Sequence, residues 1–440
     1  MISVPPATPD HPVWLHVGTL LDGSNTAPAK DAHVVYDAAG IRFVGRSGQT
    51  PPASLIRSGQ TVPDVVAPDA TLLPGLIDAH THLFLEGGEL DLDKRAATLK
   101  QSPAELLAAA MPRLEKLVRL GLAGVRDAGD KDGVGLALSR LCKQQSAAGV
   151  ADPGPGSTSP ATVMPYLDSP GAAIHHRGRY GSFMGGPIED HASPADCVAA
   201  RLAAGADRIK LIPTGIINFQ KGAVTAEPQM TVEELRELVA AANGAGRQTL
   251  AHASGDAGIE RVVESGVDSV EHGFFVRDDQ LERMRERRTA WVPTFAPVQV
   301  QVDEAARYNW DANVTGNLQR ILDAHAASLT KAHARGVIIL AGSDAGSCGV
   351  AHGLGLLYEL ELMERAGLPA AAVIHAATGA AADRLAFGQK FGRIEAGWRS
   401  RFILTRHSPL ATVKNLRRAR TVVFDGRVFE TDETFDGAGL

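Results

Sequence analysis

The stretch Leu73-Pro-Gly-Leu-Ile-Asp-Ala-His-Thr-His-Leu83 decides how the whole chain is interpreted. Its apolar pair Leu76-Ile77 leads into His80 and His82, which are separated by one residue. Alternate residues of a β-strand point the same way, so the two imidazoles share a face at the end of a buried strand. Such a pair can hold one metal ion. The alternative is one hydrogen-bonded core histidine and one chance neighbour, so the remaining ligands must come from elsewhere in the chain.

Length and composition narrow the class of protein. The 440 residues suffice for a large α/β barrel and a smaller domain. Lysine and arginine total 44 against 50 acidic residues, a formal charge of −6, and without a basic tract we expect neither a nucleic-acid nor a membrane partner. Three widely spaced cysteines without a C-x-x-C pair argue against a disulfide framework. The chain shows no signal-peptide pattern and no membrane-spanning apolar run, so a cytoplasmic protein is expected.

Both ends of the chain are β-rich. Strands are predicted at residues 14–18, 33–36 and 41–45, with Asp37-Ala-Ala-Gly40 as a hairpin turn. Further strands are predicted at 401–405 and 421–429, around the turn Asp425-Gly426. We therefore expect a small β-sandwich domain built from residues 1–73 and 396–440, which flanks a central domain of residues 74–395.

The middle of the chain alternates apolar strands with helical segments. The predicted strands are residues 76–85, 124–128, 161–167, 208–212, 249–253, 269–271, 291–295 and 337–341. The predicted helices are residues 103–120, 134–148, 194–204, 231–245, 256–265, 278–287, 318–335 and 353–366. This pattern indicates an α/β fold, a (β/α)8 barrel of the TIM type. A doubly wound open sheet is the alternative, but no G-x-G-x-x-G follows the first strand.

Polar residues recur where these strands end, which is where a barrel gathers its catalytic groups. Besides the histidine pair they are Lys210, His252, His272 in Glu271-His272-Gly273, and Asp344 in Gly342-Ser-Asp-Ala-Gly346. Each has an ordinary explanation, because a lysine can pair with a carboxylate, a histidine can sit in a core and an aspartate can cap a helix. Their joint occurrence predicts a metal site.

The order HTH, a fourth-strand lysine, AHA, EHG and GSDAG resembles the amidohydrolase superfamily, in particular its imidazolonepropionase-like and prolidase-like metal-dependent hydrolases. The resemblance extends from residue 72 to residue 397. It implies a binuclear centre of two divalent metal ions, usually zinc, with Lys210 carboxylated by CO₂ as the bridge. Carried over to this chain, His80, His82 and Asp344 would hold one ion, and His252 and His272 the other.

The resemblance also implies a reaction, the hydrolysis of an amide-type C–N bond in a dipeptide, an N-acyl amino acid, or an aryl amide or carbamate. A hydroxide that bridges the metals would attack, and Asp344 would be the catalytic proton shuttle to the leaving amine. Mononuclear members, such as deaminases and the cyclic amidase imidazolonepropionase, lack the bridging lysine, so Lys210 favours the binuclear form. An inactive scaffold protein is a third alternative, which the complete ligand set argues against. Superfamily members often form homo-oligomers, and we expect the same here.

Loops after the barrel strands should contact the small-molecule substrate. In residues 168–181, His175 or Tyr180 would touch the scissile carbonyl and Arg179 would meet a substrate anion, although a solvated basic loop is the alternative. His352 follows the eighth strand near the same mouth. Residues 216–222 and 294–295 are expected to form an apolar wall, and residues 308–310 a lid or a surface helix. The loop after strand three lacks the histidine-glycine form common in dipeptidases, which makes a peptide substrate less secure.

Overall fold

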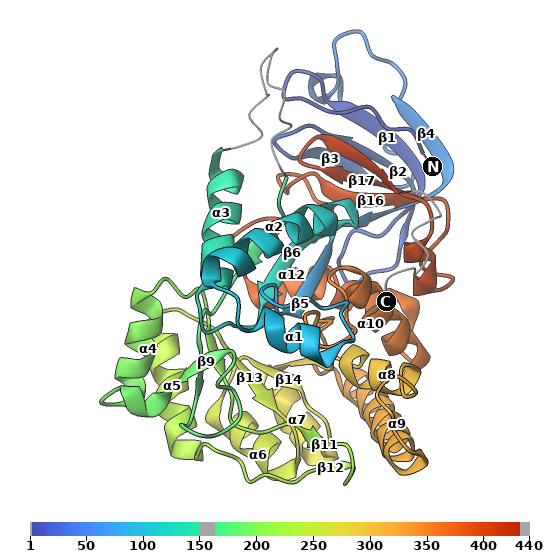
Figure 1. Cartoon of the computed structure of the whole chain (residues 1–440). Helices are drawn as coiled ribbons and strands as arrows, with labels where there is room; N and C mark the ends of the chain where they lie inside the picture. Colours follow the sequence, from blue (N-terminus) through green and yellow to red (C-terminus); the bar gives the residue numbers. More distant parts are fainter. Residues whose placement is uncertain (1, 149–162, 432–440) are drawn as a thin grey trace.

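Strands from the two ends of the chain form one sheet in the computed structural model, which describes residues 2–148 and 163–431. Its order is β18-β17-β16-β4-β1-β2-β3, and Figure 1 shows the blue N-terminal strands beside the red C-terminal ones. The strands are β1 (Val13–Leu20), β2 (Ala29–Tyr36), β3 (Ile41–Gly45), β4 (Val65–Pro74), β16 (Arg401–Thr405), β17 (Arg420–Phe424) and β18 (Arg427–Thr431). The hairpin turns predicted at residues 37–40 and 425–426 are confirmed, since they join the antiparallel pairs β2–β3 and β17–β18.

The expected sandwich takes the form of a single curled sheet around its own apolar core, which includes Leu15, Tyr36 and Phe402. Curling brings the β2–β3 turn against the segment before β16. The backbone amide of Ile41 donates to Trp398 O at 2.7 Å, and Ser400 Oγ donates to Asp37 O at 2.6 Å. Side chains on the inner face are thereby covered by the same sheet rather than by a second one.

Short parallel strands from the middle of the chain form the barrel. They are β5 (Leu76–Thr81), β6 (Leu122–Asp127), β7 (Tyr166–Asp168), β8 (Ala173–His175), β10 (Ile209–Leu211), β13 (Thr249–Ala253), β14 (Ser269–His272) and β15 (Ala290–Val292). The third barrel strand is split, because β7 pairs with β6 whereas β8 pairs with β10 and with β9 (Gly185–Pro187). The strand predicted at residues 161–167 begins later, at Tyr166. Residues 161–162 of that prediction lie outside the described residues.

The eighth barrel strand, predicted at residues 337–341, is a hydrogen-bonded segment rather than a regular strand. The backbone amide of Leu340 donates to Trp291 O at 2.9 Å, towards β15. On the other side, the amide of Ala79 donates to Ala341 O at 2.9 Å and that of Asp344 to His80 O at 2.8 Å, towards β5. This segment therefore links the seventh strand to the first and completes the ring.

Helices surround the barrel (Figure 1), and most begin and end close to the predicted positions. They are α1 (Leu92–Thr98), α2 (Pro103–Arg119), α3 (Val134–Ala148), α4 (Pro194–Ala203), α5 (Val232–Gly244), α6 (Asp256–Ser265), α7 (Asp278–Arg287), α8 (Ala296–Asp303), α9 (Ala312–Arg335), α10 (Leu354–Arg365), α11 (Ala370–Ala376) and α12 (Gly379–Leu385). Helix α9 begins earlier than the predicted residue 318, because the Asp311 side chain accepts from the amide of Val314 and caps it. Among the described helices, none is long and apolar enough to cross a membrane.

Candidate metal centre

The polar residues predicted at the strand ends meet in one cavity of about 260 Å³. His80 belongs to β5, Lys210 to β10, His252 to β13 and His272 to β14, so four different strands contribute. The six predicted ligands in the lining are His80, His82, Lys210, His252, His272 and Asp344. Each is 9% exposed or less, so the groups converge in a site largely shielded from bulk water.

Three of these residues form a compact group. His80 Nε2 and His82 Nε2 each lie 3.5 Å from the same oxygen of Asp344, Oδ1. Potential ligand atoms of the three side chains all lie within 4.8 Å of one another. Two imidazole nitrogens and a carboxylate oxygen at this spacing match the donor set of a divalent metal ion such as zinc.

Hydrogen bonds fix the tautomers of the first two histidines. His80 Nδ1 donates to the Glu271 carboxylate at 2.6 Å, and His82 Nδ1 donates to Gly129 O at 3.0 Å. The hydrogen of each neutral ring is therefore on Nδ1, and Nε2 keeps its lone pair. His80 Nε2 is buried and has no hydrogen-bond partner in the described structure. A buried acceptor without a partner is costly, and a metal ion at this position would supply one.

The second pair of histidines is held in a comparable way. His272 Nδ1 lies 2.7 Å from Thr294 Oγ1, whose own hydrogen goes to Pro293 O at 2.8 Å. The hydroxyl therefore accepts from His272 Nδ1, and His272 Nε2 remains available. His252 differs, because its Nε2 donates to Gly215 O at 3.3 Å and leaves Nδ1 available. The two rings are 4.5 Å apart between centroids.

Lys210 lies on the inner face of the barrel with 2% of its surface exposed. No carboxylate of the described residues forms an ion pair with its ammonium, so the pairing offered as an ordinary explanation is not found. Burial lowers the pKa of Lys210 to about 8, which raises the share of neutral amine near pH 7. A neutral amine is the form that can add to CO₂.

The electrostatics of the site favour neutral imidazoles. Burial lowers the pKa of His82 and of His252 to about 3, and it lowers the pKa of His80 and of His272 well below the usual value. Neutral imidazole is the form that binds metal ions. These rings are therefore in the protonation state that binds metal ions, and the donor set fits the ions implied by the resemblance.

A buried ion pair behind His80 had not been predicted. The fully buried Glu271 carboxylate accepts from His80, from Arg126 Nη2 at 2.8 Å and from Ser269 Oγ at 2.5 Å. Arg126 Nε also donates to Ala79 O at 2.5 Å, next to His80. The sequence contains a signal for this ion pair, because a buried charge needs a partner. Arg126 and Glu271 are charged residues within the apolar strand patterns Val125-Arg-Asp127 and Val270-Glu-His272.

The four predicted substrate contacts separate in the structure. Tyr180 lines the cavity, with its ring 5.3 Å from that of His252. His175, Arg179 and His352 are not part of the lining. The Arg179 side chain is exposed and donates to Glu227 O at 2.6 Å, whereas His175 is buried with Nδ1 bonded to His176 O at 2.8 Å. His352 Nε2 donates to His82 O at 3.1 Å and so holds the backbone of a candidate ligand rather than lining the cavity.

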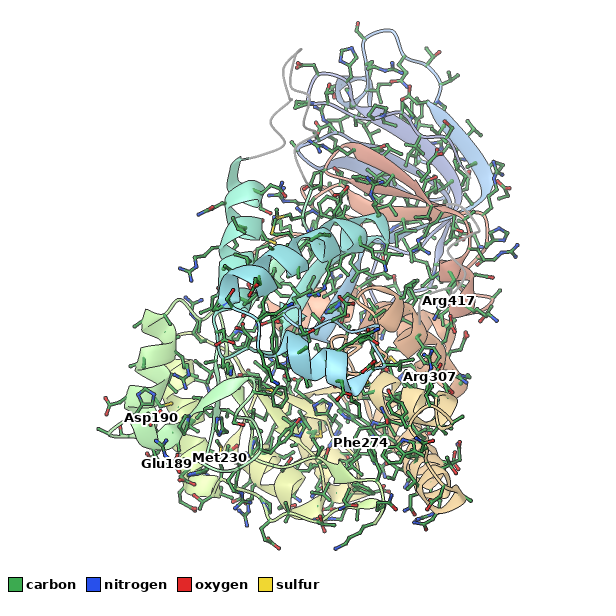
Figure 2. All side chains as sticks on the ribbon, in the orientation of Figure 1. Glu189, Asp190, Met230, Phe274, Arg307 and Arg417 are labelled. Carbon is green, nitrogen blue, oxygen red and sulfur yellow. The ribbon has the colours of Figure 1, made fainter. Side chains whose placement is uncertain are left out.

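The rest of the lining is mainly apolar. Phe274, which is labelled in Figure 2 and comes two residues after His272, contributes together with Thr294. The segment expected to form a wall contributes Ile216, Ile217 and Phe219. Further apolar members are Leu85, Phe183, Met184, Pro297 and Val298. The lining also includes Arg95, which had not been predicted from the sequence. Residues 308–310 lie in a turn rather than in a helix, and Trp310 packs against Phe219, with ring centroids 6.2 Å apart.

Comparisons with known proteins agree with this geometry. The sequence pattern of the amidohydrolase family matches residues 71–429. An ochratoxinase of Aspergillus niger is 24% identical over 97% of this chain and 87% of its own length. An imidazolonepropionase of a Polaromonas species is 31% identical, over 31% of this chain and 37% of its own. The solved structure of an Xaa-Pro dipeptidase with methionine in its active site has a TM-score of 0.75 at 25% identity, covering 96% of this chain and 100% of that one. A family match over most of the chain shows that this protein is a hydrolytic enzyme of the amidohydrolase family.

Proposed function

We propose that the protein is a binuclear metal-dependent hydrolase of amide-type C–N bonds. The observation that carries the proposal is the cluster of four buried histidines whose tautomers are fixed, each with one ring nitrogen available. They surround a lysine that makes no direct ion pair with a carboxylate of the described residues. A single ion would need only part of this donor set. A lysine among the ligands suits a second ion, because its carbamate is an anion with two oxygens.

In this proposal His80, His82 and Asp344 would hold one ion, His252 and His272 would hold the other, and Lys210, as its carbamate, would supply oxygen ligands to both. Zinc suits such nitrogen and oxygen donors. Two divalent ions, when bound, would lower the pKa of a water between them and polarise the scissile carbonyl. The described cavity then excludes bulk water and orients the amide.

Asp344 is proposed as the proton carrier of the reaction. Burial raises its pKa to about 7 in the protein alone, and a cation beside the carboxylate would favour the ionised form. The backbone amide of Asp344 is fixed to His80 O at 2.8 Å, so its carboxylate stays next to the ligands of β5. From this position it would accept the proton of the attacking water and return it to the leaving amine. Hydrolysis of the amide then gives a carboxylic acid and an amine.

The substrate is proposed to be a small amide: a dipeptide, an N-acyl amino acid, or an aryl amide or carbamate. A cavity of about 260 Å³ suits a small molecule rather than a long peptide. The names of two relatives, an ochratoxinase and an Xaa-Pro dipeptidase, support amide chemistry of this kind.

Metal counting tests the proposal. Apoenzyme is titrated with Zn²⁺, with and without bicarbonate, while bound metal and amide hydrolysis are measured. We expect activity to reach its maximum at two equivalents and the second equivalent to need bicarbonate. Lys210→Met should bind one equivalent and lose activity, whereas Lys331→Met, an exposed lysine on α9, should match the wild type. Full activity at one equivalent would instead support a mononuclear cyclic amidase or deaminase.

A further inference from the structure

Charge is distributed unevenly around the cavity. Apart from the proposed metal ligands, Arg95 is the one charged side chain in its described lining. It comes from α1, in the loop that follows β5. The guanidinium donates from Nη1 to Glu86 O at 2.5 Å and from Nη2 to Gly346 O at 2.7 Å. An arginine has five N–H donors, so these two bonds hold the group in place and leave others for a ligand.

The described lining offers no acidic partner for a substrate cation. Its one carboxylate is Asp344, which the proposed function uses as a metal ligand. Two acidic residues of the loop after β5, neither of which lines the cavity, form ion pairs of their own. Glu86 pairs with Arg113 at 2.8 Å, and Glu89 with Lys94 at 3.5 Å. An ammonium group would therefore enter a site that holds Arg95 and metal cations, without a compensating charge.

The wall across the cavity from Arg95 is apolar. The hairpin of β11 (Ile217–Asn218) and β12 (Ala223–Val224) follows β10, the fourth barrel strand, and contributes Ile217 and its neighbours to the lining. Arg95 donates to Gly346 O, and Gly346 follows the segment that serves as the eighth barrel strand. The fourth and eighth strands of an eight-stranded barrel lie opposite each other, so the hairpin faces Arg95 across the cavity. Asn317 of α9 donates to Phe219 O and to Gln220 O, both at 2.9 Å, so the hairpin is held over the site.

We propose that the substrate is an N-acylated amino acid whose carboxylate binds Arg95 and whose uncharged, apolar acyl group packs on the β11–β12 hairpin. This inference rests on the proposed function. The scissile amide then lies between the two ends, over the histidines. One water is consumed, the C–N bond breaks, and the products are the apolar carboxylic acid and the free amino acid, whose nitrogen takes up the proton from Asp344. A dipeptide with a free amino terminus is excluded by its ammonium group.

Three matched compounds separate these features in the metal-replete enzyme. N-propionyl-L-leucine has the carboxylate and no ammonium. L-alanyl-L-leucine adds only an amino group, and N-propionyl-L-leucinamide removes only the negative charge. We expect kcat/KM to be highest for N-propionyl-L-leucine and roughly ten- to a hundredfold lower for the other two, the size of one lost charged hydrogen bond.

Arg95→Met tests the assigned partner. It should raise KM for N-propionyl-L-leucine by roughly ten- to a hundredfold with little change in kcat, and leave N-propionyl-L-leucinamide within about twofold of wild type. The neutral compound thus reports any damage to the loop, because misfolding would lower both activities. Arg236→Met, an exposed arginine on α5, is the matched control and should change neither.

The results distinguish this inference from the proposed function. The inference would be overturned if wild type hydrolysed N-propionyl-L-leucine and its amide equally well and Arg95→Met changed neither rate. A preference for L-alanyl-L-leucine would also overturn it. Both results would leave the proposed amide hydrolysis standing. If no compound is hydrolysed, calorimetric binding of the same compounds to the holoenzyme decides the inference, whereas metal counting decides the proposed function separately. Tighter binding of N-propionyl-L-leucine that is lost in Arg95→Met would support it, and equal affinities would overturn it.

Discussion

Replacing Glu271 with glutamine is predicted to weaken two properties at once, the stability of the fold and the affinity for metal. The carboxylate of Glu271 is completely buried and accepts from Arg126, Ser269 and His80. A glutamine has one acceptor oxygen, and its NH₂ group would face these donors. Arg126, only 2% exposed, would also lose its counter-charge. Removing one partner of a buried ion pair typically costs roughly 3–5 kcal/mol, and we expect a loss of unfolding free energy in that range.

The effect on metal affinity has a different origin. Glu271 keeps the hydrogen of His80 on Nδ1 and orients the ring, so that Nε2 points towards Asp344. Loss of such an outer partner usually lowers metal affinity by roughly 10- to 100-fold. This corresponds to about 1.4–2.7 kcal/mol of binding free energy, less than the expected change in stability.

A double variant separates the two effects. Adding Arg126→Met to Glu271→Gln removes the uncompensated charge, so most of the unfolding free energy should return, whereas His80 still lacks its carboxylate and metal affinity should stay low. Guanidinium unfolding of the apoproteins measures stability, and competition with a chromophoric chelator measures Zn²⁺ affinity. Recovery of both properties in the double variant, or wild-type affinity in Glu271→Gln, would refute the role given to Glu271.

Three further predictions concern the site and its surroundings. Asp344→Asn should lower kcat by at least roughly 10²-fold with an unchanged circular-dichroism spectrum, and a wild-type rate would remove Asp344 from the mechanism. Chelation of the metals should lower the unfolding free energy by roughly 2.7 kcal/mol per site relative to protein with free metal at about a hundred times Kd, and identical melting curves would contradict metal binding. Burial lowers the pKa of His325 to about 4. As the pH falls below about 6.5, this histidine is protonated in the unfolded chain but stays neutral in the folded one, so the unfolding free energy drops by up to roughly 3 kcal/mol. His325→Gln, which can still donate to Pro293 O, should lose less stability than wild type between about pH 7 and pH 4.5, and equal losses in equilibrium unfolding would refute this.

Local signals in the sequence were sufficient for much of the fold. The turn at Asp425-Gly426 was predicted because both residues adopt positive φ readily, and their φ angles are 49° and 84°. The helix predicted at residues 231–245 is α5, and its predicted first residue, Thr231, is the N-cap whose side chain accepts from the amide of Glu234. The third and eighth barrel strands were harder, because each is defined by its neighbours. Pro170-Gly171 interrupts the third, and its two halves gain their hydrogen bonds from different strands.

The candidate ligands could be predicted because they stand at the ends of apolar strand patterns, and His80 and His82 share one of these. Barrel topology then brings five separate stretches of the sequence, from residue 80 to residue 344, into one cavity. Arg95 could not be found in this way. It lies on the short helix α1, in a polar segment with ordinary spacing, and only the fold brings it beside Gly346. Arg179 lies in the expected loop, but its exposed side chain donates to Glu227 O, a contact that the sequence pattern does not reveal.

Backbone conformation explains why strand alternation alone does not place the ligands. Glu271 and His272 are adjacent and would face opposite sides of a regular strand, yet Glu271 bonds His80 and His272 lines the same cavity. The φ of His272 is 69°, and those of Thr294 and Asp344 are 49° and 53°. For residues with a Cβ atom this region costs roughly 1–2 kcal/mol each, and glycine would relieve it. Glycine, however, has no imidazole, no hydroxyl to hold His272 Nδ1 and no carboxylate. The strain is therefore a consequence of turning three strand ends inwards while keeping their side chains, and a sequence pattern based on regular strands cannot reveal it.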